Sequence, residues 1–217
     1  MFKQFWLNFQ KKIQKRYRKF REGLHNTSVI NRWHKAGNPY PTPHEYRQET
    51  LKQYATKFGL DTLVETGTYM GKMPEALQDD FARIYTIEVN IDHYLNAKEK
   101  FYALPHIETI KGESGEQLEL LVAELAKPSL FWLDTHASLE KGLQEISILK
   151  ELKAILGSTQ NHVILINDAR LFTGEKGYPS LVELRNYIVS LKPLAQFEVE
   201  NDIIRVWVPV PAQSPVS

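Results

Sequence analysis

The chain has 217 residues, of which 42% are apolar and 24% are charged, as in ordinary soluble globular proteins. It contains no cysteine, which excludes disulfides and thiolate metal sites and fits a reducing compartment. No apolar run approaches the ~18 residues of a membrane span, and charges interrupt the N-terminal stretch where a secretory signal would be apolar. We therefore expect one α/β domain with a short extension, in a cytoplasmic protein that is either free or peripheral to a membrane.

The net charge of +1 hides an asymmetry between the N-terminus and the rest of the chain. Residues 1–24 hold eight basic side chains and one acidic side chain, so they carry +7 and leave −6 for the remainder. Within them, apolar residues recur every three or four positions and fall in an arc of roughly 120°, which predicts a basic amphipathic helix. The eight apolar residues are Phe2, Phe5, Trp6, Phe9, Ile13, Tyr17, Phe20 and Leu24.

The partner of this helix stays open at the level of sequence. It could dock on its own domain or a second subunit, or it could attach to an anionic membrane surface through aromatic anchors and basic residues. Nucleic acid is the less expected partner. Residues 25–43, rich in Asn, Gly and Pro, predict a linker. We place the main domain at 44–210 and a tail at 211–217.

The main domain alternates short apolar runs with helical stretches, after a first helix over about 45–58 that Gly59 ends. This alternation predicts a doubly wound, Rossmann-like parallel sheet. The expected strands are Thr62–Glu65, Ile84–Glu88, Ile107–Ile110, Leu130–Leu133 and Val163–Ile166. The expected helices are Pro74–Asp80, Tyr94–Tyr102, Gly115–Ala126, Leu139–Leu156 and Ser180–Leu191. Asn201-Asp202 joins two final runs, Phe197–Glu200 and Ile203–Val208, which predicts an antiparallel hairpin at the end of the sheet.

Polar residues follow the first two strands, where an open parallel sheet binds its ligands. Gly67 in V-E-T-G-T-Y-M-G permits a tight turn and Gly71 permits close packing of the next helix, although Gly and Thr here could form only a turn. Glu88 ends the second strand 21 positions after Gly67, a spacing at which a carboxylate can hold both hydroxyls of an adenosine ribose.

The third, fourth and fifth strands lead into further polar clusters. Gly112-Glu113-Ser114 could border an adenine ring, and Ser114 could equally cap the following helix. The fourth strand ends in Asp134-Thr135-His136 and the fifth in Asn167-Asp168-Ala169-Arg170. Two carboxylates and an amide oxygen suit Mg²⁺, with helix caps or metal-free cleft carboxylates as the alternative.

Taken in order, these motifs resemble the class I S-adenosylmethionine-dependent methyltransferases, and in particular the catechol O-methyltransferase-like group. The resemblance runs from about Leu60 to Val208. It implies that Asp134 lies between the methyl donor and a metal, and that Asn167 and Asp168 complete the metal site. It also implies a donor site. Glu65, Gly67 and Gly71 would surround the methionine portion of the donor, with Thr68 in the same turn. Glu88 would hold the ribose, and Gly112, Glu113 and Ser114 would border the adenine.

The chain departs from this group at two positions. The group has Asp then Asn, or two Asp, where this chain has Asn167-Asp168, and it has a basic Lys where this chain has Ala137. Catechol is therefore not the expected substrate. His136, two residues after Asp134, could act as the base or make a structural hydrogen bond. Arg170 could meet an anionic substrate or pair with Asp168.

We expect an S-adenosylmethionine-dependent enzyme that methylates an oxygen of a small polar acceptor, such as a sugar or a secondary metabolite. A related metal-dependent hydroxylase is one alternative. A non-catalytic binding module recruited by its basic helix is the other.

Overall fold

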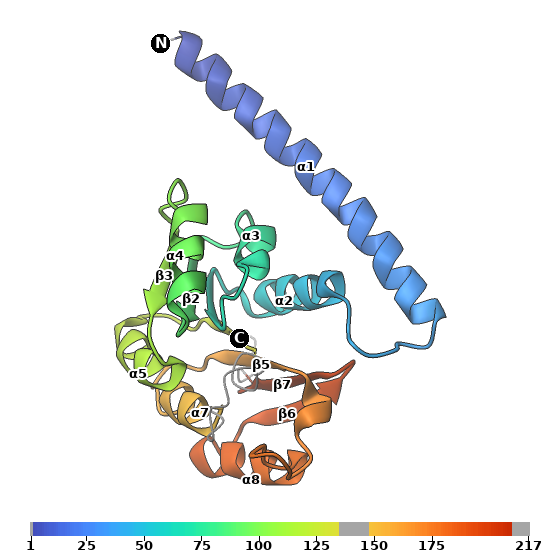
Figure 1. Ribbon diagram of the computed structural model, residues 1–217, viewed down its shortest axis with the longest axis vertical. Helices are drawn as coiled ribbons and strands as arrows, with labels where there is room; N and C mark the ends of the chain where they lie inside the picture. Colours follow the sequence, from blue (N-terminus) through green and yellow to red (C-terminus); the bar gives the residue numbers. More distant parts are fainter. Residues whose placement is uncertain (1, 135–147, 210–217) are drawn as a thin grey trace, which may run out of the picture. The chain divides into compact units, whose positions relative to one another are not determined.

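The computed structural model describes residues 2–134 and 148–209. The chain divides into two compact units, residues 1–50 and residues 51–217, and the second unit holds a seven-stranded sheet (Figure 1). The structure thus divides the chain inside a helix, seven residues beyond the predicted domain start. None of the described helices is long and apolar enough to cross a lipid bilayer.

The sheet has the order β3-β2-β1-β4-β5-β7-β6. The five strands from β3 to β5 run parallel, whereas β7 lies antiparallel to both β5 and β6. The predicted mostly parallel sheet with a terminal antiparallel hairpin is therefore confirmed. The strands are β1 (Thr62–Thr66), β2 (Arg83–Glu88), β3 (Ile107–Lys111), β4 (Leu130–Leu133), β5 (Val163–Asn167), β6 (Gln196–Glu200) and β7 (Ile203–Trp207).

Helices cover both faces of the sheet, because alternate side chains of the central strands are buried on opposite sides. On one face, Val64, Phe131 and Ile164 belong to an apolar cluster with α5, α7 and α8. On the other face, residues of the second half of α2 pack near the sheet edge, where the Tyr54 and Trp207 rings lie 6.1 Å apart. The helices are α2 (His44–Phe58), α3 (Lys72–Leu77), α4 (Ile91–Lys100), α5 (Ser114–Glu124), α7 (Ile148–Leu156) and α8 (Leu181–Leu191), with a 3₁₀ turn η1 (Ala169–Leu171).

The N-terminal helix α1 (Phe2–Lys35) is longer than the sequence predicted. The prediction that a linker begins at residue 25 is wrong, because the helix continues for eleven further residues. Asn26 and Asn31 are only mildly unfavourable in a helix, and the first strong breaker is Gly37, which follows the helix with a φ of 82°.

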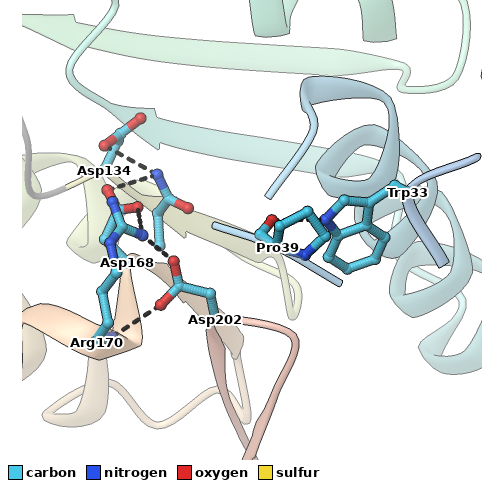
Figure 2. Close-up of polar contacts among 7 residues, drawn as sticks. Trp33, Pro39, Asp134, Asp168, Arg170 and Asp202 are labelled. Carbon is cyan, nitrogen blue, oxygen red and sulfur yellow. Dashed lines mark hydrogen bonds and ion pairs between the residues drawn. The ribbon is translucent and has the colours of Figure 1, made fainter. Parts of the chain in front are cut away.

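Contacts with the first half of α2 explain why residues 25–35 stay helical. The His25 ring nitrogen lies 3.3 Å from the Glu45 carboxylate, and the Asn26 amide donates to Gln48 at 3.1 Å. Trp33 is buried, and its ring lies 4.8 Å from the Tyr46 ring at a tilt of 49°. Its indole N–H donates to the Pro39 carbonyl at 2.8 Å, and Figure 2 shows these two residues. Such tertiary contacts outweigh weak local propensities, and no local sequence pattern reports them.

Several helices begin or end at other residues than predicted. Asn90 caps α4, because its side chain accepts hydrogen bonds from the N–H groups of Asp92 and His93, so the helix begins three residues before the predicted Tyr94. α3 begins after Gly71 and ends at Leu77, three residues before the predicted end. Residues 139–147 of the helix predicted over 139–156 lie outside the described residues, and the remainder forms α7.

A buried histidine lies before β5, at the amino ends of the parallel strands. His162 Nδ1 accepts the Ser129 N–H at 3.1 Å, and the His162 ring meets the Phe131 ring at 4.9 Å. Burial, helped by the charge of Lys192, lowers the pKa of His162 to about 4. The folded protein therefore holds this ring neutral in a pH range in which the unfolded chain, with an ordinary pKa of 6.5, takes up a proton.

His162 should make the stability of the protein fall as pH falls. Between pH 6.5 and about 4 the unfolded state binds the extra proton, so stability is lost across that window, by roughly 2 kcal/mol after allowance for solvent screening. His162→Asn keeps an acceptor for Ser129 but cannot titrate. Urea unfolding at pH 7 and pH 4.5 should show a smaller difference for the variant, and equal pH dependence of the two proteins would contradict the assignment.

Candidate functional site

The carboxyl ends of β1, β2, β4 and β5 meet at one edge of the sheet. The strand order reverses between β1 and β4, which is the point where open α/β sheets bind ligands. Four predicted site residues lie here: Glu65 in β1, Glu88 at the end of β2, Asp134 directly after β4 and Asn167 at the end of β5. The parallel register therefore brings together residues that are up to about a hundred positions apart in the chain.

The turn after β1 runs close to the end of β2. The N–H groups of Gly67 and Thr68 both point to the Ile87 carbonyl, at 2.9 and 3.3 Å. Gly67 has a φ of 83° and Gly71 a φ of 65°, a region that favours glycine. A Cβ at Gly71 would also lie 3.0 Å from the Phe101 ring, so a larger residue would push the α3 start away from α4. The expected tight turn is confirmed, and the close contact of Gly71 is with Phe101 at the end of α4.

Glu88 fixes this turn through its carboxylate. One oxygen accepts the Tyr69 N–H at 2.9 Å and the other accepts the Asn90 N–H at 2.7 Å. The Glu88 side chain is buried. Beside it the exposed Tyr69 ring meets the His93 ring edge-on at 4.9 Å.

A chain of hydroxyls leads to the second buried carboxylate. Thr86 donates to Glu65 at 2.7 Å, and the hydroxyls of Thr68 and Thr86 lie 2.6 Å apart. Because the Thr86 hydroxyl has one proton and donates it to Glu65, the Thr68 hydroxyl is the donor in its hydrogen bond to Thr86. This contact places Thr68 inside the site, and it adds Thr86, which the sequence analysis missed because Thr in a strand carries no functional signal.

The pKa of Glu65 lies well above its ordinary value of 4.5. Burial is the main cause, and the neighbouring charges of Asp134 and Glu88 add to it, while the Thr86 hydrogen bond acts in the opposite direction. Glu65, Glu88 and Asp134 thus form an acidic group, and its electrostatic cost falls when a positive charge arrives.

The residues after β3 correct one prediction. Gly112 donates to the Glu88 carbonyl at 3.1 Å, and a Cβ there would lie 2.6 Å from the Gln117 side chain. The cap of α5 is Glu113, whose carboxylate accepts the Glu116 N–H at 2.9 Å. Ser114 is instead the first helical residue, and its hydroxyl donates to the buried Glu151 of α7. Of the two roles left open for Ser114, capping the helix is excluded because Glu113 is the cap, and its place at the adenine stays a prediction.

An arginine connects two buried carboxylates below the end of β5 (Figure 2). Arg170 Nη1 lies 2.6 Å from an Asp168 oxygen and also donates to Asp202, whose other oxygen accepts the Arg170 N–H at 2.8 Å. Of the two predicted roles for Arg170, the ion pair with Asp168 is confirmed. Asp202 was predicted only as a turn residue, because its partners lie more than thirty positions away in the chain.

The same contacts test the predicted magnesium site. Asn167 turns its amide N–H₂ toward Asp134 at 3.3 Å and toward Asp168 at 3.0 Å, so it presents a donor where Mg²⁺ needs an oxygen. The Arg170 guanidinium already neutralises Asp168. Asp134, Asn167 and Asp168 as the structure places them do not fit Mg²⁺, and magnesium is not confirmed. The described residues contain no cluster of three or more His, Asp or Glu side chains able to hold a metal.

Two further features bear on the predicted catalytic residues. His136 lies outside the described residues, so its role stays a prediction. Asn167 Oδ1 is buried and accepts no hydrogen bond from the part of the chain that the structure describes. An orphaned buried acceptor is costly, and a donor group on a ligand would satisfy it.

Comparison with known proteins finds similarity in structure alone. No protein-family model and no curated protein matches the chain. The solved structures that match include an O-methyltransferase of Bacillus cereus in complex with S-adenosylhomocysteine. It is 16% identical with a TM-score of 0.56, and the match covers 85% of this chain and 90% of that one.

Two other matches show the range of this similarity. A putative caffeoyl-CoA O-methyltransferase of Staphylococcus aureus is 14% identical over 86% of this chain and 100% of its own, with a TM-score of 0.55. The N-methyltransferase NodS of Bradyrhizobium japonicum is 12% identical over 76% and 96%, with a TM-score of 0.51. Such identities establish the fold and leave the acceptor atom undetermined. The chain has the fold of the class I S-adenosylmethionine-dependent methyltransferases.

Proposed function

We propose that this protein transfers the methyl group of S-adenosylmethionine to an oxygen of a small polar acceptor, such as a sugar or a secondary metabolite. The observation that carries the proposal is the acidic group of Glu65, Glu88 and Asp134 around the turn after β1. The donor carries positive charge on its sulfonium and on its amino group. The acidic group has the complementary charge: burial raises the pKa of Glu65, and the charges of Asp134 and Glu88 add to that effect.

Within this proposal, each segment of the site takes one part of the donor. Glu65, with the turn from Gly67 to Gly71, lies beside the methionine portion, and Glu88 accepts hydrogen bonds from the ribose hydroxyls. Gly112, Glu113 and Ser114 border the adenine. The structural support is the buried position of the Glu88 carboxylate at the end of β2 and the close approach of the Gly112 backbone, which donates to the Glu88 carbonyl.

The chemistry asks little of the protein beyond alignment. The bound donor supplies a methyl group on a sulfonium, which is already activated toward a nucleophile. The acceptor oxygen forms a bond to the methyl carbon while the bond from carbon to sulfur breaks, and the acceptor proton goes to a base. His136 is our candidate for that base. Asn167 Oδ1, which has no partner among the described residues, could accept a hydrogen bond from the acceptor or the donor and so hold it in line.

Donor binding should depend on Glu88. Glu88→Gln keeps the size of the side chain but loses its charge, and a charge-assisted hydrogen bond contributes roughly 1.5–3 kcal/mol, or about tenfold or more in affinity. Calorimetry with S-adenosylhomocysteine should show that loss. The matched control is Glu108→Gln, a half-exposed carboxylate on β3 that pairs with Arg83, and it should bind like the wild type. No detectable binding by the wild type at millimolar ligand would reject the donor site.

The Glu65 carboxylate should lower the stability of the folded protein and strengthen donor binding. Because its pKa is raised, the folded protein loses stability as pH rises from 4.5 toward the folded pKa, and the loss persists above it. Glu65→Gln still accepts from Thr86 and removes the buried charge. It should raise the melting temperature at neutral pH by about 2–4 °C, the shift expected for ~1 kcal/mol at this size, and weaken S-adenosylmethionine binding. A variant that is less stable, or that binds as tightly, would show that Glu65 is structural.

Activity should appear without added metal. The chain is incubated with methyl-labelled S-adenosylmethionine and a cell extract, with and without a chelator, and the labelled product is identified. We expect equal transfer to a small molecule in both arms, because Arg170 rather than a cation neutralises Asp168. Transfer that disappears with chelator and returns with Mg²⁺ would contradict this reading of the site. Donor binding with no transfer to any component would favour a binding module.

A further inference from the structure

One face of α1 carries an uncovered stripe of large apolar side chains. Each of them is between 49% and 64% exposed. They recur every three or four residues and fall within an arc of about 80° on the helix, at about 100° per residue. Soluble proteins rarely leave a contiguous apolar surface of this kind in water. The residues of this apolar stripe are Trp6, Phe9, Ile13, Tyr17, Phe20 and Leu24.

The stripe ends where α1 becomes anchored. Its last member is Leu24, and the next two residues, His25 and Asn26, contact Glu45 and Gln48 of α2. From there to Lys35 the helix packs through Trp33, which is buried. Residues 2–24 are therefore the part of α1 that carries the exposed stripe, and Figure 1 shows α1 as one continuous helix.

The charge of this segment selects the partner. Residues 1–24 carry +7. At about 100° per residue, Arg16 flanks the stripe on one side and Arg21 on the other. Long basic side chains beside an apolar face can reach an anionic surface while that face is buried. Aromatic side chains favour the boundary between water and hydrocarbon at a membrane surface.

Two other occupants fit these observations less well. A second copy of the chain would bring one +7 segment against another, and the single acid Glu22 cannot compensate for the repulsion. A nucleic acid would neutralise the basic residues and leave the apolar stripe in water. Because no described helix can cross a bilayer, the segment would have to lie along the surface and not span it.

We propose that residues 2–24 form a membrane-surface helix that binds anionic lipid bilayers, with the apolar stripe inserted between headgroups and its basic residues at the phosphate level. The helix holds the methyltransferase-fold unit at that surface. The proposal uses no residue of the donor site, so it stands or falls independently of the function proposed above.

The test is co-sedimentation of the full chain with vesicles of phosphatidylcholine, with and without about one third phosphatidylserine. The stripe variant is Phe9→Ser with Phe20→Ser. The matched control is Leu120→Ser with Leu194→Ser, which removes two exposed apolar residues of the other unit. Circular dichroism and donor binding, measured on each protein, verify that the fold is retained.

We expect the wild type and the control to bind anionic vesicles. The affinity of the stripe variant should be lower by a factor of about ten or more. Binding should weaken with salt and should be much lower on phosphatidylcholine alone. Equal binding of the stripe variant and the control would overturn the proposal. A wild type that does not sediment with anionic vesicles would also overturn it. In that case, a dimer that the stripe variant cannot form would identify a second copy as the partner, and binding to RNA would identify a nucleic acid.

Discussion

Buried negative charge at the carboxyl ends of the parallel strands is the constraint on which the rest of this site depends. A carboxylate removed from water is costly unless something compensates it. The chain uses a different means for each one. Backbone N–H groups of Tyr69 and Asn90 hold Glu88, and Arg170 forms ion pairs with both Asp168 and Asp202. Glu65 accepts a hydrogen bond from the Thr86 hydroxyl, and burial, with the nearby charges of Asp134 and Glu88, still raises its pKa well above the ordinary value.

This uneven compensation separates the edge of the sheet into two regions. Around β5 the Arg170 guanidinium forms ion pairs with Asp168 and Asp202, which favours a structural role for these contacts. Around β1 and β2 the carboxylates of Glu65, Glu88 and Asp134 act on one another as like charges, which favours a ligand that brings positive charge. A methyl donor with a sulfonium has that charge, whereas a neutral nucleoside or a dinucleotide with its phosphates does not. The electrostatics of the site and the fold shared with known methyltransferases therefore point to the same ligand.

The sequence was sufficient to predict the sheet, because its strands are short apolar runs and the antiparallel pair has an Asn201-Asp202 turn. It also placed Glu88 and Gly67 on the correct elements, since both follow from spacing along the chain. It could not predict Thr86 or the second partner of Arg170, because these contacts join residues 18 to 32 positions apart. The magnesium prediction used residue types, their places at strand ends and a family resemblance, and none of these tells which atom of Asn167 faces the carboxylates.

The end of α1 illustrates the same limit from another side. Local pattern located the apolar stripe as far as Leu24, but Trp33 and its neighbours continue the helix through contacts with α2. The result is a helix with two segments of different character. One is held by the chain itself, and the other presents aromatic and basic residues outward.

Proton exchange on donor binding tests the account of the site most directly. A positive ligand beside Glu65 should lower its pKa, so the carboxyl should lose protons to the buffer. Calorimetric titration with S-adenosylmethionine between pH 5 and 8, in buffers that differ in ionisation enthalpy, measures the number of protons released on binding. The account predicts net proton release by the wild type and none by Glu65→Gln. Binding heats that do not depend on the buffer at any pH, or equal release by both proteins, would contradict it.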